Sequence, residues 1–457
     1  MAGNEASIPL ADAHKQSKKI SAPRIIILGF AVLIVVGMIL LALPVSSVSG
    51  NSIGWIDALF ISTSAVCVTG LSVVDVPSTF TTFGELVILV LVQIGGLGFM
   101  VFGVLFAIVI GKKIGLRERL LIQQSINSNS TQGVVRLAIN IFLIALIIES
   151  MAAFVLALRW SGEYGTARAI YYGIFHAISA FNNAGFSLWS DSLMQYVGDP
   201  TVNIVITLLF IFGGLGFTVI LDILKKRNWK DLSLHSKIVL TTNAVLITAG
   251  TFLILCMELL NPETFGPLAW QERLWASYFQ GVVTRTAGFN SIDLTAMLPT
   301  SQLLMIILMF IGGSSGSTAG GIKTNTFAVL IMTVYAIIRG REDVEIYKRR
   351  LATDFILRAL AVIIISLGVV LVCAIILTIT ERHTDHDFMD ILFEATSAFG
   401  TVGMTLGLTG KLTFAGKLVI IATMFIGRLG PLTMAYAMTR SSKKQYYRYP
   451  EEKLMIG

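Results

Sequence analysis

The sequence is poor in charged residues and in cysteine. Asp, Glu, Lys and Arg make up 13% of its 457 residues, whereas an average soluble domain carries roughly 25%. The three cysteines, Cys67, Cys256 and Cys373, lie far apart in apolar stretches and form no C-x-x-C pair. Neither a disulfide framework nor a zinc site is therefore predicted. The scarcity of charge excludes an ordinary soluble domain, and the high apolar content excludes a disordered chain.

The sequence is instead rich in apolar residues. They form 55% of the chain, and the mean hydropathy is +0.79. Residues 25–43 are an uncharged run, which as a helix would span about 28 Å, enough to cross a bilayer core. We expect a retained first helix, because a cleaved signal peptide has a shorter apolar core and a small-residue cleavage site. The chain is predicted to be a multi-pass protein of the cell membrane.

The net charge of +7 is concentrated between the apolar runs. Lys and Arg cluster in residues 1–24, 111–136, 225–237, 339–358 and 440–457. The positive-inside rule predicts that these segments and both termini are cytoplasmic. Contact with anionic lipid or a protein partner explains the charge better than a nucleic-acid surface does, so no nucleic acid is expected as a partner.

A long apolar span, a short amphipathic segment and a second apolar span occur in this order four times. The short segments end at Gly70, Gly185, Gly288 and Gly403. Segments of about 12 residues are too short to cross a bilayer and fit re-entrant half-helices. Non-helical backbone at membrane depth is tolerated where it lines a water-filled cavity. We expect an all-α membrane protein with four tandem helix–pore-helix–helix (M1-P-M2) repeats, arranged with pseudo-fourfold symmetry around a central pore.

The repeats divide the chain into six parts. In the first two repeats the second span has a glycine-rich centre, at 93–99 and 212–217, for which close helix packing is expected in preference to a kink. The predicted parts are a cytoplasmic N-terminal tail at 1–24, pore repeats at 25–110, 111–224, 225–338 and 339–440, and a cytoplasmic C-terminal tail at 441–457.

The repeated glycines suggest an ion-selectivity filter. Glycine permits backbone conformations in which successive carbonyls face one axis, and four such strands make rings of oxygens that replace the hydration shell of K⁺. A plain loop role is the alternative, but four glycines in register, each after the same kind of half-helix, favour the filter. The flanking residues Asn182, Asn183, Thr284 and Arg285 are expected to brace the filter from behind.

The third repeat is interrupted by a polar segment with little helix propensity. We expect a flexible loop beneath the filter that plugs the pore in one position and opens it in another; a static unwound segment is the alternative. A nucleotide-binding P-loop is rejected, because Ile322 separates Gly321 from Lys323 and the context is intramembrane. The predicted gate loop consists of Gly312, Gly313, Ser314, Ser315, Gly316, Ser317, Thr318, Ala319, Gly320 and Gly321.

Arg428 lies in the glycine-rich part of the last span. A cation inside a membrane span is costly and usually faces a cavity with partners. We expect it to lie beside the gate loop, where it raises the barrier to cations and hydrogen-bonds loop carbonyls. The alternative is that it pairs only with backbone or with Glu149. Lys323, which follows the loop, is expected to snorkel toward the cytoplasm.

The remaining polar residues predict no enzyme. Glu149 and Glu258 are proton-relay candidates or else snorkelling or helix-pairing carboxylates, and these interpretations stay open. A polar connection containing His383, Asp385, His386 and Asp387 is more typical of a solvated external loop than of a metal site. No catalytic constellation of side chains is visible.

As a set, these features resemble the Trk/Ktr/HKT superfamily of potassium transporters, specifically its Ktr branch with KtrB-type membrane subunits. The resemblance covers residues from about 25 to 440, and the short tail before the first repeat, where Trk-type relatives carry additional helices, favours the Ktr branch. Family members with serine at a filter glycine tend to favour sodium, so four glycines imply potassium. The resemblance implies K⁺ binding at Gly70, Gly185, Gly288 and Gly403, and a filter made of Val68, Thr69, Gly70, Asn183, Ala184, Gly185, Thr286, Ala287, Gly288, Thr401, Val402 and Gly403.

The resemblance also implies partners besides the lipid bilayer. It points to a homodimer on a cytoplasmic RCK-type (KtrA-like) regulatory ring that binds ATP or ADP, often with stimulation by sodium. This chain contains no strand–GxGxxG–helix unit, so no cofactor is expected in it and nucleotide control would come from the separate regulatory subunit. The basic segments 225–237 and 339–350 and the tail 440–457 are candidate docking surfaces.

The expected function is therefore that of the ion-translocating membrane subunit of a potassium uptake system. An inward-negative potential supplies about 2.3 kcal/mol per 100 mV for each cation, so passive, channel-like transport needs no chemistry. Because the four filter segments differ in sequence, a single well-formed site and less stringent selectivity are expected. The alternative is a K⁺ symporter coupled to H⁺ or Na⁺, which inverted repeats would support; all four repeats here are predicted to start on the cytoplasmic side. A membrane enzyme is a remote third hypothesis, because no catalytic group of side chains is visible.

Overall fold

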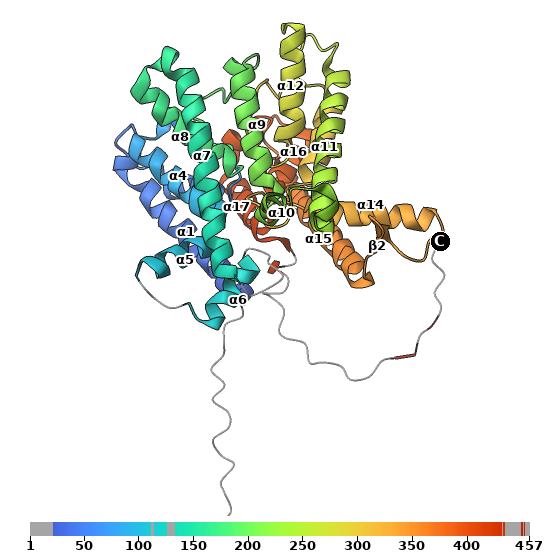
Figure 1. The fold of residues 1–457 in the computed structure, drawn as a ribbon. Coiled ribbons are helices and arrows are strands. Elements are labelled where there is room, and N and C mark those ends of the chain that lie inside the picture. The colour runs from blue at the N-terminus through green and yellow to red at the C-terminus, as the bar shows by residue number, and fades with distance from the viewer. Residues whose placement is uncertain are drawn as a thin grey trace, which may run out of the picture.

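The computed structural model describes residues 22–110, 114–125, 133–431, 433–434, 449–450 and 452. Residues 1–21 of the predicted N-terminal tail and most of the predicted C-terminal tail lie outside this part. Within it the chain is predominantly helical with almost no strand (Figure 1), which confirms the all-α fold class. The described strands are the short antiparallel pair β1 (Glu345–Ile346) and β2 (Arg349–Arg350).

The helices follow the predicted order of long span, half-helix and second span. Each half-helix follows a longer helix, and short 3₁₀ turns lie at Pro44–Ser46, Met194–Tyr196, Trp229–Asp231 and Thr409–Lys411. The α-helices are α1 (Ala22–Ala42), α2 (Trp55–Val66), α3 (Val76–Thr79), α4 (Thr82–Leu97), α5 (Phe99–Val109), α6 (Leu116–Ser125), α7 (Val134–Tyr164), α8 (Thr166–Phe181), α9 (Pro200–Leu215), α10 (Phe217–Lys226), α11 (Leu234–Glu258), α12 (Trp270–Val283), α13 (Pro299–Phe310), α14 (Thr324–Ile338), α15 (Thr353–Thr380), α16 (Phe388–Gly400) and α17 (Phe414–Leu429).

Among the described residues, α1, α7, α11 and α15 are each long and apolar enough to cross a membrane. These four helices coincide with the predicted first spans of the four repeats. Two further spans result if the bent pairs α4–α5 and α9–α10 are each counted as one. The shorter helices α2, α8, α12 and α16 are the predicted half-helices, and each has a largely buried C-terminal half.

The second spans of the first two repeats bend sharply, which the sequence interpretation missed. The axes of α4 and α5 differ by 94°, and those of α9 and α10 by 95°. Gly98 (φ 87°) and Gly216 (φ 93°) lie at the two bends, in a backbone region that residues with a Cβ atom rarely enter. Close packing is also present, since a Cβ atom at Gly95 would lie 2.1 Å from the Val66 carbonyl oxygen. The expectation of packing without a kink was therefore wrong.

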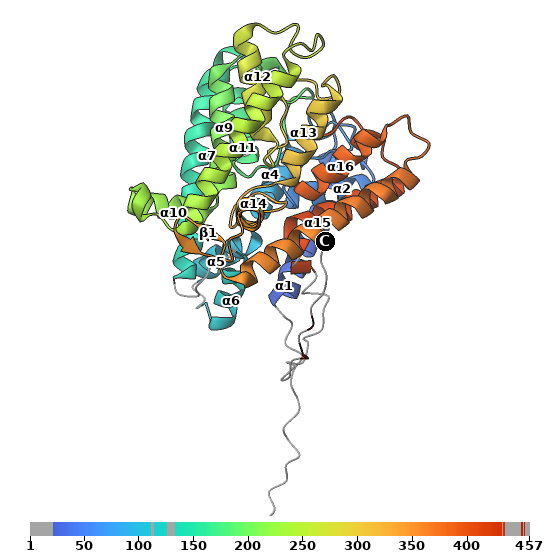
Figure 2. The same ribbon diagram turned by 90° about the vertical axis from the view of Figure 1, so that its right-hand side faces the viewer.

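The second span of the third repeat is interrupted, as predicted. Helix α13 ends at Phe310, and α14 begins only at Thr324. A parallel bridge between Ile311 and Ile322 closes the intervening segment. Helix α14 then lies across the direction of α11, with the β1–β2 hairpin beside it (Figures 1 and 2).

Two buried carboxylates fix the starts of second spans to the ends of first spans. At the end of α11, Glu258 accepts hydrogen bonds from the Leu298 backbone N–H (3.0 Å) and the Thr264 hydroxyl (2.6 Å). After α15, Glu381 accepts from the Thr413 backbone N–H (3.0 Å) and hydroxyl (2.7 Å). Leu298 and Thr413 precede the first turns of α13 and α17. These contacts favour the helix-pairing interpretation of Glu258.

Candidate functional site

The four half-helices end in the same backbone geometry. Two residues before each repeated glycine, a non-glycine residue adopts a positive φ: Val68 (57°), Asn183 (59°), Thr286 (70°) and Thr401 (50°). The glycines themselves also have positive φ: Gly70 (92°), Gly185 (71°), Gly288 (75°) and Gly403 (93°). Non-glycine residues with positive φ are uncommon and strained. Four of them at equivalent positions therefore indicate that the surrounding structure imposes the same backbone conformation in all four segments.

The four glycine segments meet one another in a closed series of backbone contacts. A Cβ atom on Gly70 would lie 2.4 Å from the Ala184 carbonyl oxygen, and a Cβ atom on Gly185 would lie 2.7 Å from the Cα atom of Gly288. A Cβ atom on Gly288 would lie 2.6 Å from the Val402 carbonyl oxygen, and one on Gly403 would lie 2.0 Å from that of Thr69. The structure therefore brings the four predicted filter segments together, in the order of the chain, and leaves no room for a side chain at the glycines.

Serine residues that the sequence interpretation missed hold three of these segments. The backbone N–H groups of Thr69, Ala184 and Val402 donate to the carbonyls of Ser64, Ser179 and Ser397, each at 2.8 Å. The Ser64 and Ser397 hydroxyls accept from the N–H groups of Gly70 (3.0 Å) and Gly403 (3.2 Å), and the Ser179 hydroxyl donates to the Phe186 carbonyl (2.7 Å). The signal was present: a serine stands six positions before three of the four glycines.

The third segment is built differently. The residue six positions before Gly288 is Val282, so the serine is absent here. The Ala287 N–H donates to the Val283 carbonyl at 3.0 Å instead. The third segment thus lacks the hydroxyl contact of the other three, and side chains from outside its own half-helix support it.

The amides of Asn182 and Asn183 bind groups that lie around the predicted filter segments. The Asn182 amide donates to Gln93 (2.6 Å) on α4 and to Glu149 (3.2 Å) on α7, and the Gln93 amide also donates to Glu149 (3.0 Å). The Asn183 amide donates to the Thr286 hydroxyl and the Arg285 carbonyl, both at 3.3 Å. Asn183 therefore connects the second and third filter segments.

The predicted gate loop lies against α9 and the filter. The N–H groups of Ser314 and Thr318 donate to the carbonyls of Gly214 (2.9 Å) and Gly213 (3.1 Å). A Cβ atom on Gly320 would lie 2.2 Å from the Thr401 hydroxyl. The loop therefore touches the fourth filter segment as well as the helix after the second.

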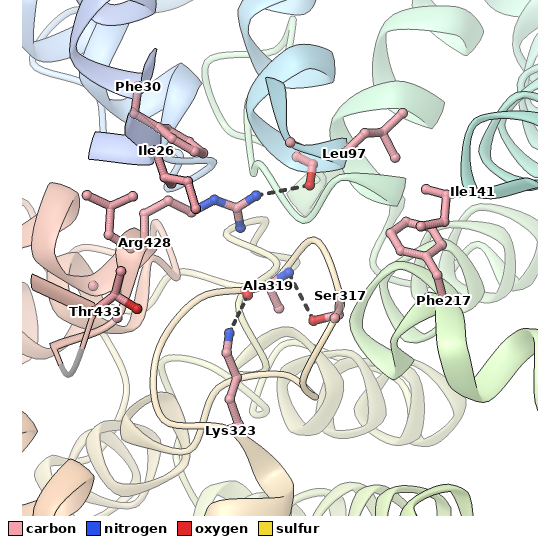
Figure 3. A pocket seen from close by; sticks show the side chains of 16 residues that line it. Ile26, Phe30, Leu97, Ile141, Phe217, Ser317, Ala319, Lys323, Arg428 and Thr433 are labelled. Carbon is pink, nitrogen blue, oxygen red and sulfur yellow. Dashed lines mark hydrogen bonds between the residues drawn. The ribbon is translucent and has the colours of Figure 1, made fainter. Parts of the chain in front are cut away.

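Two cationic side chains, Arg428 and Lys323, bind the carbonyls of this loop, and Figure 3 shows the contact of Lys323 with Ala319. The Arg428 guanidinium donates to the Thr318 carbonyl, and also to the carbonyls of Gly95 (2.5 Å) and Gly96 (3.0 Å) at the end of α4. Arg428 thus bridges α17, the loop and α4 by backbone contacts, and its described hydrogen bonds do not include Glu149.

Lys323 does not follow its expected course toward the cytoplasm. Its ammonium group folds back and donates to the carbonyls of Ala319 (2.7 Å) and Gly320 (3.3 Å). The expectation of snorkelling was wrong, because the loop offers carbonyl oxygens that no helical N–H group satisfies, within one turn of the lysine.

A cavity of about 150 Å³ adjoins the loop, and both cations line it (Figure 3). Its walls come from α1, α4, α7, α10 and α17 as well as from the loop. Figure 3 shows the Arg428 and Lys323 side chains approaching the loop from different elements. The lining residues are Ile26, Phe30, Gly96, Leu97, Gly98, Ile141, Phe217, Gly316, Ser317, Ala319, Lys323, Gly427, Arg428, Leu429, Gly430 and Thr433.

The polar connection with His383 and His386, between α15 and α16, forms local pairs. Arg382 donates to His383 (3.0 Å), and His386 pairs with Asp390 (3.0 Å) at the start of α16. In the part of the chain that the structure describes, no group of three or more His, Cys, Asp or Glu residues is placed to hold a metal ion.

Comparison with known proteins assigns the family. The family model for TrkH, described as a cation transport protein, matches residues 6–446. The chain belongs to the TrkH family. Its members are transport proteins, in agreement with the prediction that the chain is no enzyme, and with its apolar helices the chain is a multi-pass membrane protein.

Several relatives of this TrkH-family chain align over nearly their whole length. The chain is 47% identical to the Ktr system potassium uptake protein B of Bacillus subtilis over 96% of this chain and 97% of that protein. It is 41% identical to the protein of the same name from Vibrio alginolyticus, over 98% and 97%. It is 40% identical to the potassium/sodium uptake protein NtpJ of Enterococcus hirae, over 96% and 98%.

A solved structure has the same fold. The crystal structure of the potassium transporter TrkH from Vibrio parahaemolyticus matches with a TM-score of 0.72 at 20% sequence identity, over 93% of this chain and 86% of that chain. At this identity the likeness supports the fold alone. The family model and the Ktr relatives confirm the resemblance inferred from the repeated glycines, the interrupted span and Arg428.

Proposed function

We propose that this chain is the ion-translocating membrane subunit of a Ktr-type potassium uptake system. Two relatives that align over nearly the whole chain, at 47% and 41% identity, are named as potassium uptake proteins of Ktr systems. The observation that carries the proposal is the closed series of contacts among the four glycine segments. Backbone carbonyls converging in this way can replace the water around a dehydrated cation.

The twelve predicted filter residues would act in equivalent groups of three, each ending at a glycine. The proposed K⁺ site lies between Gly70, Gly185, Gly288 and Gly403. The carbonyls of Thr69, Ala184 and Val402 are candidate ligands, since each lies in close contact with the neighbouring segment. The unlike third segment fits the expectation of a single well-formed site rather than identical rings of carbonyls.

Residues Gly312–Gly321 would close the pore from the side of the 150 Å³ cavity. Arg428 and Lys323 support this role, because each binds carbonyls of the loop and brings a positive charge to the cavity. A fixed cation raises the barrier to K⁺ in a low-dielectric pathway. Displacing the loop would break these contacts and open a passive pathway; coupling to H⁺ or Na⁺ is the alternative mechanism.

We infer four repeats with pseudo-fourfold symmetry, both termini in the cytoplasm, and a homodimer on a separate RCK-type ring that binds ATP or ADP. The Ktr names of the relatives support a multi-subunit system. The described basic residues of 225–237 and 339–350 are the proposed contacts to that ring.

Flux through purified protein in liposomes tests this function. We expect deletion of Gly312–Gly321 to increase K⁺ flux several-fold and to leave it dependent on the imposed voltage. His383→Ala is a matched control, because the exposed His383 lies in the external connection away from the loop, and it should behave as wild type. Unchanged or abolished flux in the deletion variant would leave the loop as scaffold, and a strict requirement for a proton or sodium gradient would identify symport.

A further inference from the structure

The gate loop is connected to the filter through side chains as well as by proximity. The Thr318 hydroxyl donates to Asn183 (3.1 Å), which also binds the third filter segment. A second connection starts at Arg285, directly before the strained residue Thr286. Loop and filter therefore share hydrogen bonds on the side of the third repeat, where the filter lacks its serine.

Arg285 is a buried cation whose side chain turns away from the filter toward α11. It is 6% exposed, and its Nη2 donates to the Asn243 side-chain oxygen at 2.8 Å. A longer contact of 3.5 Å reaches the carbonyl of Gly312, the first residue of the loop. Within the described residues, neither Nε nor Nη1 of Arg285 has a hydrogen-bond partner, and no carboxylate lies at ion-pair distance. A buried guanidinium so placed depends strongly on its few polar contacts.

Asn243 connects this cation to the loop. An arginine only donates hydrogen bonds, so the amide oxygen of Asn243 must face it and the amide nitrogen must point elsewhere. That nitrogen donates to the Ser314 hydroxyl (3.2 Å), which lies 3.0 Å from the hydroxyl of Thr324 at the start of α14. The chain of contacts thus runs from the predicted third filter segment through Arg285 and Asn243 to the start of the loop, and through Ser314 to Thr324, the first residue of α14.

The space around these groups is small. Arg285, Asn243 and Gly313 line a cavity of about 10 Å³ together with residues of α9, α11 and α12, a volume that fits roughly one water molecule. Residues equivalent to Arg285, three positions before the other filter glycines, are Cys67, Asn182 and Gly400. Asn182 braces its segment against α4 and α7, so the third repeat alone directs this brace to the gate loop.

We propose that Arg285 and Asn243 form a strut that couples ion binding in the filter to the position of the gate loop. The inference rests on the proposed function of filter and loop. When the loop leaves, the Gly312 carbonyl and the Ser314 hydroxyl leave with it, so the guanidinium loses its longer contact and the Asn243 amide loses an acceptor. Because Arg285 is bonded to Thr286, the filter backbone moves with it. By linkage, a loop position that changes K⁺ affinity is itself changed by K⁺ binding to the same extent.

The test is a double-mutant cycle on K⁺ affinity, measured as the K⁺-dependent rise in the thermal stability of the full-length protein in lipid nanodiscs. The loop is released by deleting Gly312–Gly321 or, in a second variant that keeps the full length of the chain, by Arg428→Gln. In the wild-type background we expect loop release to change the K⁺ affinity by about fivefold or more, the low end of typical coupling between sites. In Asn243→Ala the same release should change it by less than about twofold.

Gln93→Ala is the matched control, because Gln93 supports the equivalent brace of the second repeat without a described contact to the loop. It should retain the full effect of loop release on K⁺ affinity. An equal effect in wild type and Asn243→Ala would overturn the strut, as would the absence of any effect in wild type. If loop release fails even to increase K⁺ flux, the gate itself is wrong, so the two failures are distinguishable.

Discussion

At the scale of single residues, positions of similar conformation differ in what surrounds them. Gly403 and Gly407 have φ of 93° and 94° in the same segment. A Cβ atom on Gly403 would lie 2.0 Å from the Thr69 carbonyl oxygen, whereas nothing lies within 4 Å of one on Gly407. The two glycines therefore separate the effect of backbone conformation from that of the contact between filter segments.

We predict that Gly403→Ala abolishes selective K⁺ transport, because the added methyl group forces the first and fourth filter segments apart. Gly407→Ala carries the same conformational strain, about 1–2 kcal/mol, without the clash, and it should lower stability while leaving K⁺/Na⁺ selectivity intact. Thermal unfolding and ion flux in liposomes measure the two effects. Equal loss of selectivity in both variants would show that strain, and not the contact, is decisive.

At the scale of elements, the composition of the sequence predicted the half-helices and the interrupted span. The local sequence pattern did not predict the bends between α4 and α5 and between α9 and α10. The five glycines of Gly312–Gly321 cannot favour a helix, so the break before α14 could be predicted from the sequence. The stretches before Gly98 and Gly216 fit a straight packed helix as well as a bent one, and the contacts that select the bend come from elsewhere in the chain. The partners of Lys323 and the role of Asn243 likewise depend on tertiary contacts that a single apolar span does not reveal.

The bend at Gly216 also supports the gate loop. The Phe217 N–H, the first of α10, donates to the Gly316 carbonyl at 3.0 Å. A Cβ atom on Gly216 would lie 2.7 Å from the Ser315 carbonyl oxygen. The bend therefore presents an unsatisfied helix N-terminus to the loop, and the loop provides its acceptor.

We predict that Gly216→Ala lowers the free energy of unfolding by about 1–3 kcal/mol through backbone strain and raises basal K⁺ flux by displacing the loop. Gly103→Ala in α5 is the control, since that glycine is helical and its added methyl group would meet nothing within 4 Å. It should be neutral or stabilise the helix by up to about 1 kcal/mol. If the Gly216→Ala protein is destabilised but has wild-type basal flux, the bend at Gly216 does not hold the gate loop in place and the prediction is wrong.

At the scale of the whole molecule, K⁺ transport is driven either by the K⁺ gradient and the membrane potential alone or also by a coupled H⁺ or Na⁺ gradient. Symport requires a residue that exchanges its coupled ion with both sides of the membrane. Glu149 is 4% exposed and bound by Gln93 and Asn182 behind the filter, and Glu258 is 0% exposed and bound by the connection to α13. Both carboxylates are thus engaged in fixing helices and filter, which favours passive transport.

We predict that the voltage at which net K⁺ flux stops follows the K⁺ gradient alone. A passive pathway balances the potential, about 2.3 kcal/mol per 100 mV for each charge, against the K⁺ gradient, so an added pH or Na⁺ gradient leaves this voltage unchanged. Proteoliposomes of wild type and Glu149→Gln, clamped at a series of potentials, measure it. The substitution removes a buried carboxylate beside Asn182 and is expected to alter flux, but not the voltage at which flux reverses. A reversal voltage that moves with pH in wild type and no longer does so in Glu149→Gln would identify Glu149 as the coupling group. Loss of the hydrogen bonds between Glu149 and its neighbours could change the rate of K⁺ flux, but it could not change the voltage at which the flux reverses.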